Sequence, residues 1–181
     1  MSALEAIVYE RGALKLLDQL KLPLETTYVD VEDCDACWRA IKDMNVRGAP
    51  AIAIAAALAL AVELEKKKGE LATCEAAEAF VHERFDHMYT SRPTAVNLGE
   101  ARTRIKSLAT SLKANGDAGA MVEGVIEACE AMLAEDVASC RAIGAKGAEA
   151  LLRAVNAKDG QKIKVMTCCN TGSLATAGYG T

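Results

Sequence analysis

Apolar and polar positions alternate over short distances at the start of the chain, and the pattern changes to helical spacing after Asp33. Segments 5–10, 13–17 and 24–31 read EAIVYE, ALKLL and LETTYVDV. They are separated by an Arg-Gly turn and by Pro23. Short runs of this kind between turn residues predict strands. We therefore expect a small antiparallel β-meander in this part of the chain.

Helical periodicity follows as far as residue 156. We expect five helices, over about 33–44, 50–68, 73–90, 93–113 and 117–156. Thr73 and Asp117 are of the residue types that N-cap helices. The uninterrupted apolar run over 49–62 is rich in Ala and too short to span a bilayer, so it predicts a buried helix.

The last part of the chain changes character again. Residues 162–168, KIKVMTC, predict a strand, and a polar Gly-rich turn and a new helix follow. This is how a parallel α/β domain begins. Because one strand cannot make a sheet, we expect the chain to be the first half of a longer protein. The predicted fold is α/β overall: a mainly helical domain with a small antiparallel sheet over 1–158, and the start of a Rossmann-like domain over 159–181.

Composition narrows the classes of function. The 181 residues are 51% hydrophobic and 25% charged, which is typical of globular proteins in water. The net charge of −4 argues against a nucleic-acid surface, which would need a basic patch. No segment is long and apolar enough to predict a membrane span. Seven cysteines without framework spacing indicate reduced thiols, and hence a cytoplasmic protein, with the nucleus as the alternative.

Three expected helix starts have unusual sequences: VRGAP at 46–50, SRPT at 91–94 and CCNTG at 168–172. The free N–H groups and the dipole of a helix N-terminus attract anions, and an Arg beside it adds bidentate contacts. For each motif alone, turn residues and a solvated Arg are an adequate explanation. Together, the three motifs predict binding of a phosphorylated small molecule.

The cysteines divide into two groups. Cys34 and Cys37 form a C-x-x-C, but they lie on an expected helix without a second pair at zinc spacing, so we expect structural thiols and no metal. Cys168 and Cys169 end the expected strand. Because side chains alternate along a strand, at most one of the two faces a site. A thiol beside a helix N-terminus has its thiolate favoured.

Three ordered blocks, 44–64, 91–98 and 167–181, resemble the signature segments of the methylthioribose-1-phosphate isomerase family. The opening LEAIVYERG resembles the start of that family as well. A weaker resemblance extends to ribose-1,5-bisphosphate isomerase and to regulatory subunits of the initiation-factor nucleotide-exchange complex. The resemblance implies a Rossmann-like second domain, a homodimer, and no cofactor. The implied reaction is conversion of 5-methylthioribose 1-phosphate to 5-methylthioribulose 1-phosphate in methionine salvage.

The resemblance also implies roles for particular residues. Cys169 matches the catalytic cysteine. The implied substrate-binding residues are Arg47, Gly48, Ala49, Arg92, Asn170, Thr171 and Gly172. Cys168 departs from the family, which has His at this position. The family's catalytic aspartate and an Asn-Lys pair lie beyond residue 181, so we expect the chain alone to be inactive. A regulatory subunit and another ribose-phosphate isomerase are the alternatives.

Overall fold

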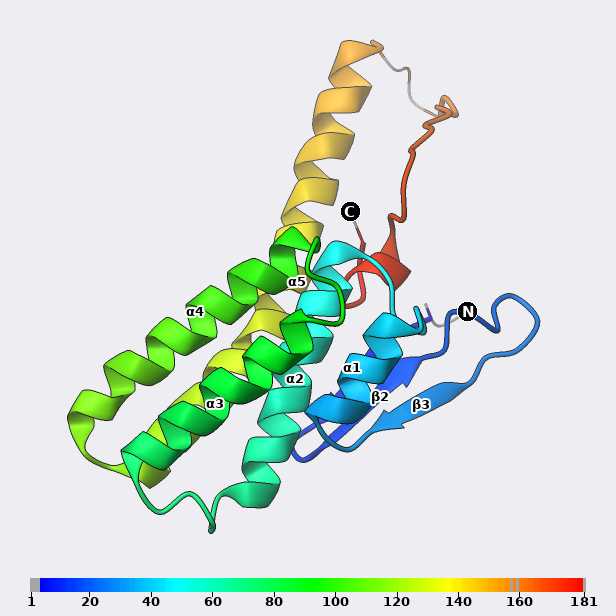
Figure 1. Ribbon diagram of the computed structural model, residues 1–181. Helices are drawn as coiled ribbons and strands as arrows, with labels where there is room; N and C mark the ends of the chain where they lie inside the picture. The colour runs from blue at the N-terminus through cyan, green and yellow to red at the C-terminus, as the bar shows by residue number, and fades with distance from the viewer. Residues whose placement is uncertain (1–3, 157, 159, 181) are drawn as a thin grey trace.

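The computed structural model describes residues 4–156, 158 and 160–180, and it places a three-stranded sheet beside a body of helices (Figure 1). The strands are β1 (Ile7–Glu10), β2 (Ala13–Leu17) and β3 (Tyr28–Val31). They pair antiparallel in the order β1-β2-β3, with Leu16 opposite both Ile7 and Val29. The predicted meander is confirmed, and the chain is an α/β protein.

Five α-helices lie within the described residues. They are α1 (Cys34–Lys42), α2 (Ala49–Lys67), α3 (Cys74–Tyr89), α4 (Val96–Leu112) and α5 (Ala118–Ala154). Thr73 and Asp117 cap α3 and α5 as predicted, each accepting a hydrogen bond from a first-turn N–H. α4 begins later than expected, because the chain first makes a turn in which the Ala95 N–H donates to the Arg92 carbonyl (3.0 Å). None of the helices in this described part is long and apolar enough to cross a membrane.

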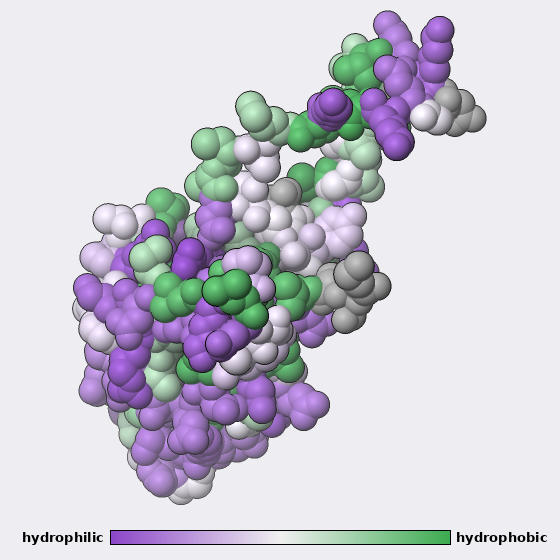
Figure 2. Space-filling view, turned by 90° about the vertical axis from the view of Figure 1, so that its right-hand side faces the viewer, coloured by the Kyte–Doolittle hydropathy of each residue, from purple (hydrophilic) through white to green (hydrophobic). Residues whose placement is uncertain are grey.

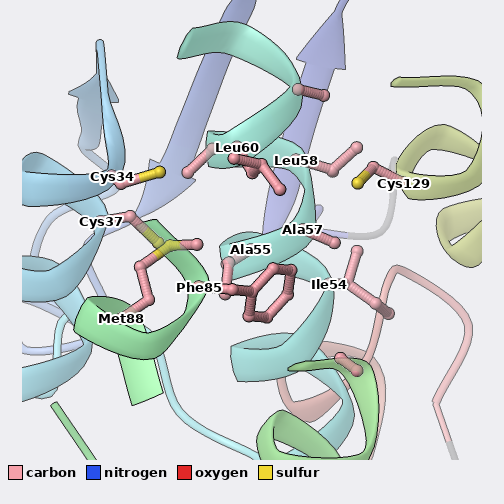
Figure 3. Packing of buried hydrophobic residues seen from close by; sticks show 14 of the residues in the cluster. Cys34, Cys37, Ile54, Ala55, Ala57, Leu58, Leu60, Phe85, Met88 and Cys129 are labelled. Atoms are coloured by element: carbon pink, nitrogen blue, oxygen red, sulfur yellow. The ribbon is translucent and has the colours of Figure 1, made fainter. Parts of the chain in front are cut away.

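Helix α2 is the centre of the fold. All residues over 51–64 are buried, and the helix contacts each of the other four helices as well as β1 and β2. Its many alanines allow the neighbouring helices to approach closely, and larger side chains such as Phe85 and Met88 of α3 fill the space between (Figure 3). Each fully buried Leu or Phe contributes about 1.5–3 kcal/mol. The predicted buried helix is confirmed.

One charged group of α2 is buried in this core. Glu63 is 7% exposed and accepts hydrogen bonds from the Cys34 N–H (2.9 Å) and from Nε of Arg84 (3.0 Å). Arg84 also donates to Asp35 (3.0 Å). Because a buried carboxylate needs partners, this ion-paired cluster ties α1, α2 and α3 together.

The strand expected over 162–168 does not form among the described residues. The segment runs along the outside of the molecule without a partner strand in the described ranges, and Val165 and Met166 are 72% and 95% exposed. A strand needs hydrogen-bonded neighbours, and an apolar local pattern cannot supply them. The helix expected next is instead a short 3₁₀ turn, Ser173–Ala175. With the end of α5, the segment forms an arm that projects from the body (Figures 1 and 2).

Candidate functional site

The N-terminal ends of α2 and α4 meet at an open hollow of about 800 Å³. Residues from all three of the motifs singled out in the sequence line it, although the motifs lie far apart along the chain. The lining residues that the sequence predicted are Arg47, Gly48, Ala49, Arg92, Cys169 and Asn170. The fold therefore brings together most of the predicted site.

Both helices place their first residues at this hollow, Ala49 and Pro50 for α2 and Val96 and Asn97 for α4, and of these four only Pro50 carries no N–H. The N-cap positions are Gly48 for α2 and Ala95 for α4, and among the described residues neither helix has a side-chain cap. Helices α1, α3 and α5 are each capped by an Asp or Thr side chain. The first N–H groups of a helix have no partner within the helix, and the dipole makes this end positive. The two uncapped helices thus form an edge whose chemistry suits an anion.

Two arginines add full positive charge to this edge. Arg47 donates from Nε to the Met44 carbonyl (3.0 Å), which leaves the outer nitrogens of its guanidinium available to the hollow. Other arginines of the molecule, such as Arg84 and Arg104, pair with carboxylates. Within the described ranges, Arg47 and Arg92 form no such pair. Guanidinium groups without a carboxylate partner, beside free N–H donors, are well suited to a phosphate.

The start of α2 lies directly against the 3₁₀ turn that follows Cys169. Gly48 has a φ of 94°, which favours glycine, and a Cβ built on it would lie 2.5 Å from the Cβ and carbonyl oxygen of Ala175. The chain after this turn is anchored as well, because the Ala177 N–H donates to Asp136 of α5 (2.8 Å). These contacts hold the Cys169 segment at the mouth of the hollow.

Cys169 is the exposed cysteine that lines the hollow. Both it and Cys168 are exposed, but only Cys169 is among the described residues that line the hollow. Burial raises the pKa of the Cys37 and Cys129 thiols to about 12, and it raises the pKa of Cys34 well above its ordinary value. These core thiols stay protonated at neutral pH and are unreactive.

The remaining predicted residues lie differently. Thr171 and Gly172 do not line the hollow. Gly172 has a φ of 86° and turns the chain back so that its backbone packs against Gly180. A substrate-binding role for Thr171 and Gly172 stays a prediction.

Several lining residues were not among the predicted site residues: Met44, Pro50, Ile52, Thr94, Ala95, Val96 and Asn97. Pro50 and Thr94 lie within the two Arg motifs and the others lie beside them, which is the signal that could have found them. Pro50 occupies the second position of α2, after Ala49. No group of three potential ligands among His, Cys, Asp and Glu gathers to hold a metal in the described part of the chain.

Comparisons with known proteins agree on one family. Residues 45–177 match the model of the initiation factor 2 subunit family. A methylthioribose-1-phosphate isomerase of Ostreococcus lucimarinus is 80% identical over 181 residues, covering 100% of this chain and 50% of that protein. The enzyme of the same name from Vitis vinifera is 50% identical over 180 residues, covering 99% and 47%. The chain spans about half the length of the curated relatives it matches.

Solved structures share the fold. The 5-methylthioribose 1-phosphate isomerase of Pyrococcus horikoshii superposes with a TM-score of 0.79 at 30% identity, covering 98% of this chain and 46% of that one. Subunit delta of the translation initiation factor eIF-2B from A. fulgidus superposes with a TM-score of 0.76 at 32% identity, covering 97% and 48%. The fold is thus similar to one protein named as an enzyme and one named as a translation factor.

Proposed function

Because the chain belongs to the initiation factor 2 subunit family, we propose that it forms the phosphate-binding part of a methylthioribose-1-phosphate isomerase. The 80% identity with a relative of that name supports this choice within the family. The reaction converts the aldose 5-methylthioribose 1-phosphate to the ketose 5-methylthioribulose 1-phosphate, a step of methionine salvage, without a cofactor.

One observation carries the proposal: two uncapped helix N-termini and two arginines, without a carboxylate partner among the described residues, surround a single hollow. The substrate carries its phosphate on C1, so binding the phosphate places the reacting carbons beside it. The N–H groups of α2 and α4 and the guanidinium groups of Arg47 and Arg92 bind this phosphate.

Cys169 then acts at the sugar end. Cys169 lines the same hollow as the two arginines. Aldose–ketose isomerisation moves hydrogen between C1 and C2, and a thiol can move a proton or stabilise the developing charge during this step. The phosphate on C1 blocks simple ring opening, so the ring oxygen requires an acid. In this proposal, an aspartate outside residues 1–181 supplies it.

The proposal includes the wider architecture. Residues 159–181 begin a Rossmann-like domain, and the protein acts as a homodimer in the cytoplasm. A regulatory subunit of an initiation-factor complex is the second candidate, because subunit delta of eIF-2B has a similar fold. Such a subunit would have no turnover of the phosphosugar.

A single substitution tests the proposed isomerase activity and the role of Cys169 in it. In the full-length protein, Cys169→Ser should lower isomerase turnover by about 10²–10⁴-fold, the usual contribution of a positioned proton-transfer group. Cys168→Ser is the matched control and should stay within about threefold of wild type, since Cys168 lies outside the hollow. Loss of less than threefold in Cys169→Ser contradicts the assignment. An inactive wild-type protein favours the regulatory candidate.

A further inference from the structure

Gln19 is a buried polar residue that joins two parts of the site. It lies two positions after the end of β2 and is 8% exposed. Its backbone N–H donates to the Asn45 carbonyl (2.9 Å), in the loop that leads to Arg47. Its side-chain Nε2 donates to the Leu174 carbonyl (2.7 Å), in the 3₁₀ turn after Cys169. One residue therefore touches both the loop that carries an arginine and the segment that carries the thiol.

The chain next to Gln19 is fixed by further hydrogen bonds. Asp18 is 7% exposed, and its Oδ1 accepts from Nδ2 of Asn45 (2.9 Å) and from the Leu20 N–H (3.1 Å). The backbone around Gln19 is thus fixed by the hydrogen bonds of Asp18 and by its own hydrogen bond to Asn45. The side-chain amide of Gln19 extends from this fixed backbone to the 3₁₀ turn.

The turn is held by the Gly48–Ala175 packing, by the hydrogen bond from Gln19, and just after it by the Ala177 N–H, which donates to Asp136 of α5. Gly48 and Ala175 meet through packing, which has no preferred direction of its own. The hydrogen bond from Gln19 to Leu174 is directional, and it fixes where along α2 the turn sits. Cys169 and Asn170 precede that turn and move with it.

We propose that Gln19 is a positioning residue that sets the place of the Cys169 thiol relative to the Arg47 loop. This inference rests on the proposed isomerase function. Gln19 itself lies outside the hollow and binds no substrate. Its effect passes through the Leu174 carbonyl to the segment that bears the thiol.

A positioning role predicts a specific kinetic change. Without the amide contact, Arg47, Arg92 and both helix starts keep their places, so phosphate binding and KM stay within about threefold of wild type. The thiol loses its place, and misplacement of a reacting group by about 1 Å lowers turnover by about 10²-fold. We therefore expect kcat to fall by about 10- to 100-fold.

The test uses full-length Gln19→Met and Gln19→Asn. Met has a similar length but no donor, whereas Asn keeps the amide but is too short to reach Leu174. Gln161→Met is the matched control, because Gln161 is exposed and its side chain bonds locally, accepting from the Lys158 N–H (3.0 Å). Both Gln19 variants should show the fall in kcat at steady KM, and the control should match wild type.

A second readout does not depend on activity. Mass spectrometry of the folded variants measures how fast iodoacetamide alkylates Cys169 relative to Cys168. We expect each Gln19 variant to shift this ratio at least threefold and Gln161→Met to leave it unchanged. An unchanged ratio in a folded Gln19 variant, or a KM that changes as much as kcat, overturns the inference. If the wild-type protein lacks isomerase activity, the proposed function fails and the alkylation ratio alone decides the role of Gln19.

Discussion

Gly48 at the start of α2 and Ala175 in the 3₁₀ turn lie so close that no side chain fits at position 48. This contact joins the start of α2, which lines the hollow, to the segment that carries Cys169. The same glycine has a positive φ, so both its backbone conformation and its surroundings require the absence of a side chain.

Gly48→Ala should therefore destabilise the protein more than a conformational penalty alone. Gly12→Ala is the matched control, because Gly12 has a φ of 86° but no described atom lies within 4 Å of the place that an added Cβ would take. We expect about 1–2 kcal/mol of destabilisation for Gly12→Ala from backbone conformation. Gly48→Ala should lose about 1–3 kcal/mol more from overpacking. Urea unfolding measures the free energy of unfolding of both variants. An equal decrease in the two would show that Ala175 moves aside at no cost.

Removal of Arg92 should weaken binding of phosphorylated ligands. In the full-length protein we expect Arg92→Ala to raise KM for the phosphosugar about tenfold, since a charge-assisted hydrogen bond contributes about 1.5–3 kcal/mol. Arg153→Ala is the control, because Arg153 is exposed on α5 and pairs with Glu149. Steady-state kinetics gives the answer, and an unchanged KM would remove Arg92 from the site.

The cysteines should differ sharply in reactivity. At pH 8, a thiol with a pKa of about 12, as in Cys37 and Cys129, is ionised in about one molecule in 10⁴. Iodoacetamide should therefore label Cys168 and Cys169 in the folded protein long before these core thiols. Peptide mass spectrometry over a time course checks the order. Labelling of Cys37 at the rate of Cys169 before unfolding would contradict the buried arrangement.

The buried ion-paired cluster should be sensitive to loss of one partner. Arg84→Met leaves Glu63 as a buried carboxylate without its cation, and we expect a destabilisation of about 3 kcal/mol. Adding Glu63→Gln should recover part of this loss, because the amide oxygen can still accept from the Cys34 N–H. Urea unfolding of the single and double variants measures the effect. A double variant less stable than Arg84→Met would argue against charge burial as the cause.

Stability should fall in acid for a related reason. Hydrogen bonds from Arg11 hold the pKa of the Glu130 carboxyl below its usual range. A carboxyl whose folded pKa is depressed stabilises the protein above its unfolded pKa of about 4.3, and this contribution is lost as pH falls through the folded pKa. Unfolding curves between pH 7 and pH 2 should show the loss below about pH 4. Arg11→Met should make the decrease smaller, and an identical pH profile would exclude this pair as a contributor.

Local patterns in the sequence predicted most helices and strands well, but they predicted the contacts between these elements only in part. The apolar run of α2 and the caps Thr73 and Asp117 were readable because helix signals lie within a few residues. The Gln19–Leu174 contact was not readable, because the partners are 155 positions apart and neither has a distinctive neighbourhood. The prediction of a strand over 162–168 was wrong for a similar reason, since a strand needs a partner strand and the local sequence does not show whether one lies beside it.

The burial of α2 has a consequence for how the hollow would bind the proposed phosphosugar. Because α2 is packed on all sides from its first turns, the helix start that faces the hollow cannot shift without disturbing the core. The conformational entropy of arranging these donors is lost during folding, so an anion bound as proposed would meet a preorganised surface. The Cys169 segment is exposed over 164–170 and is held instead by the contacts that the turn after it makes with Gly48, Gln19 and Asp136. The hollow therefore has one rigid wall, formed by the start of α2, and a second wall, formed by the Cys169 segment, whose position depends on a few contacts.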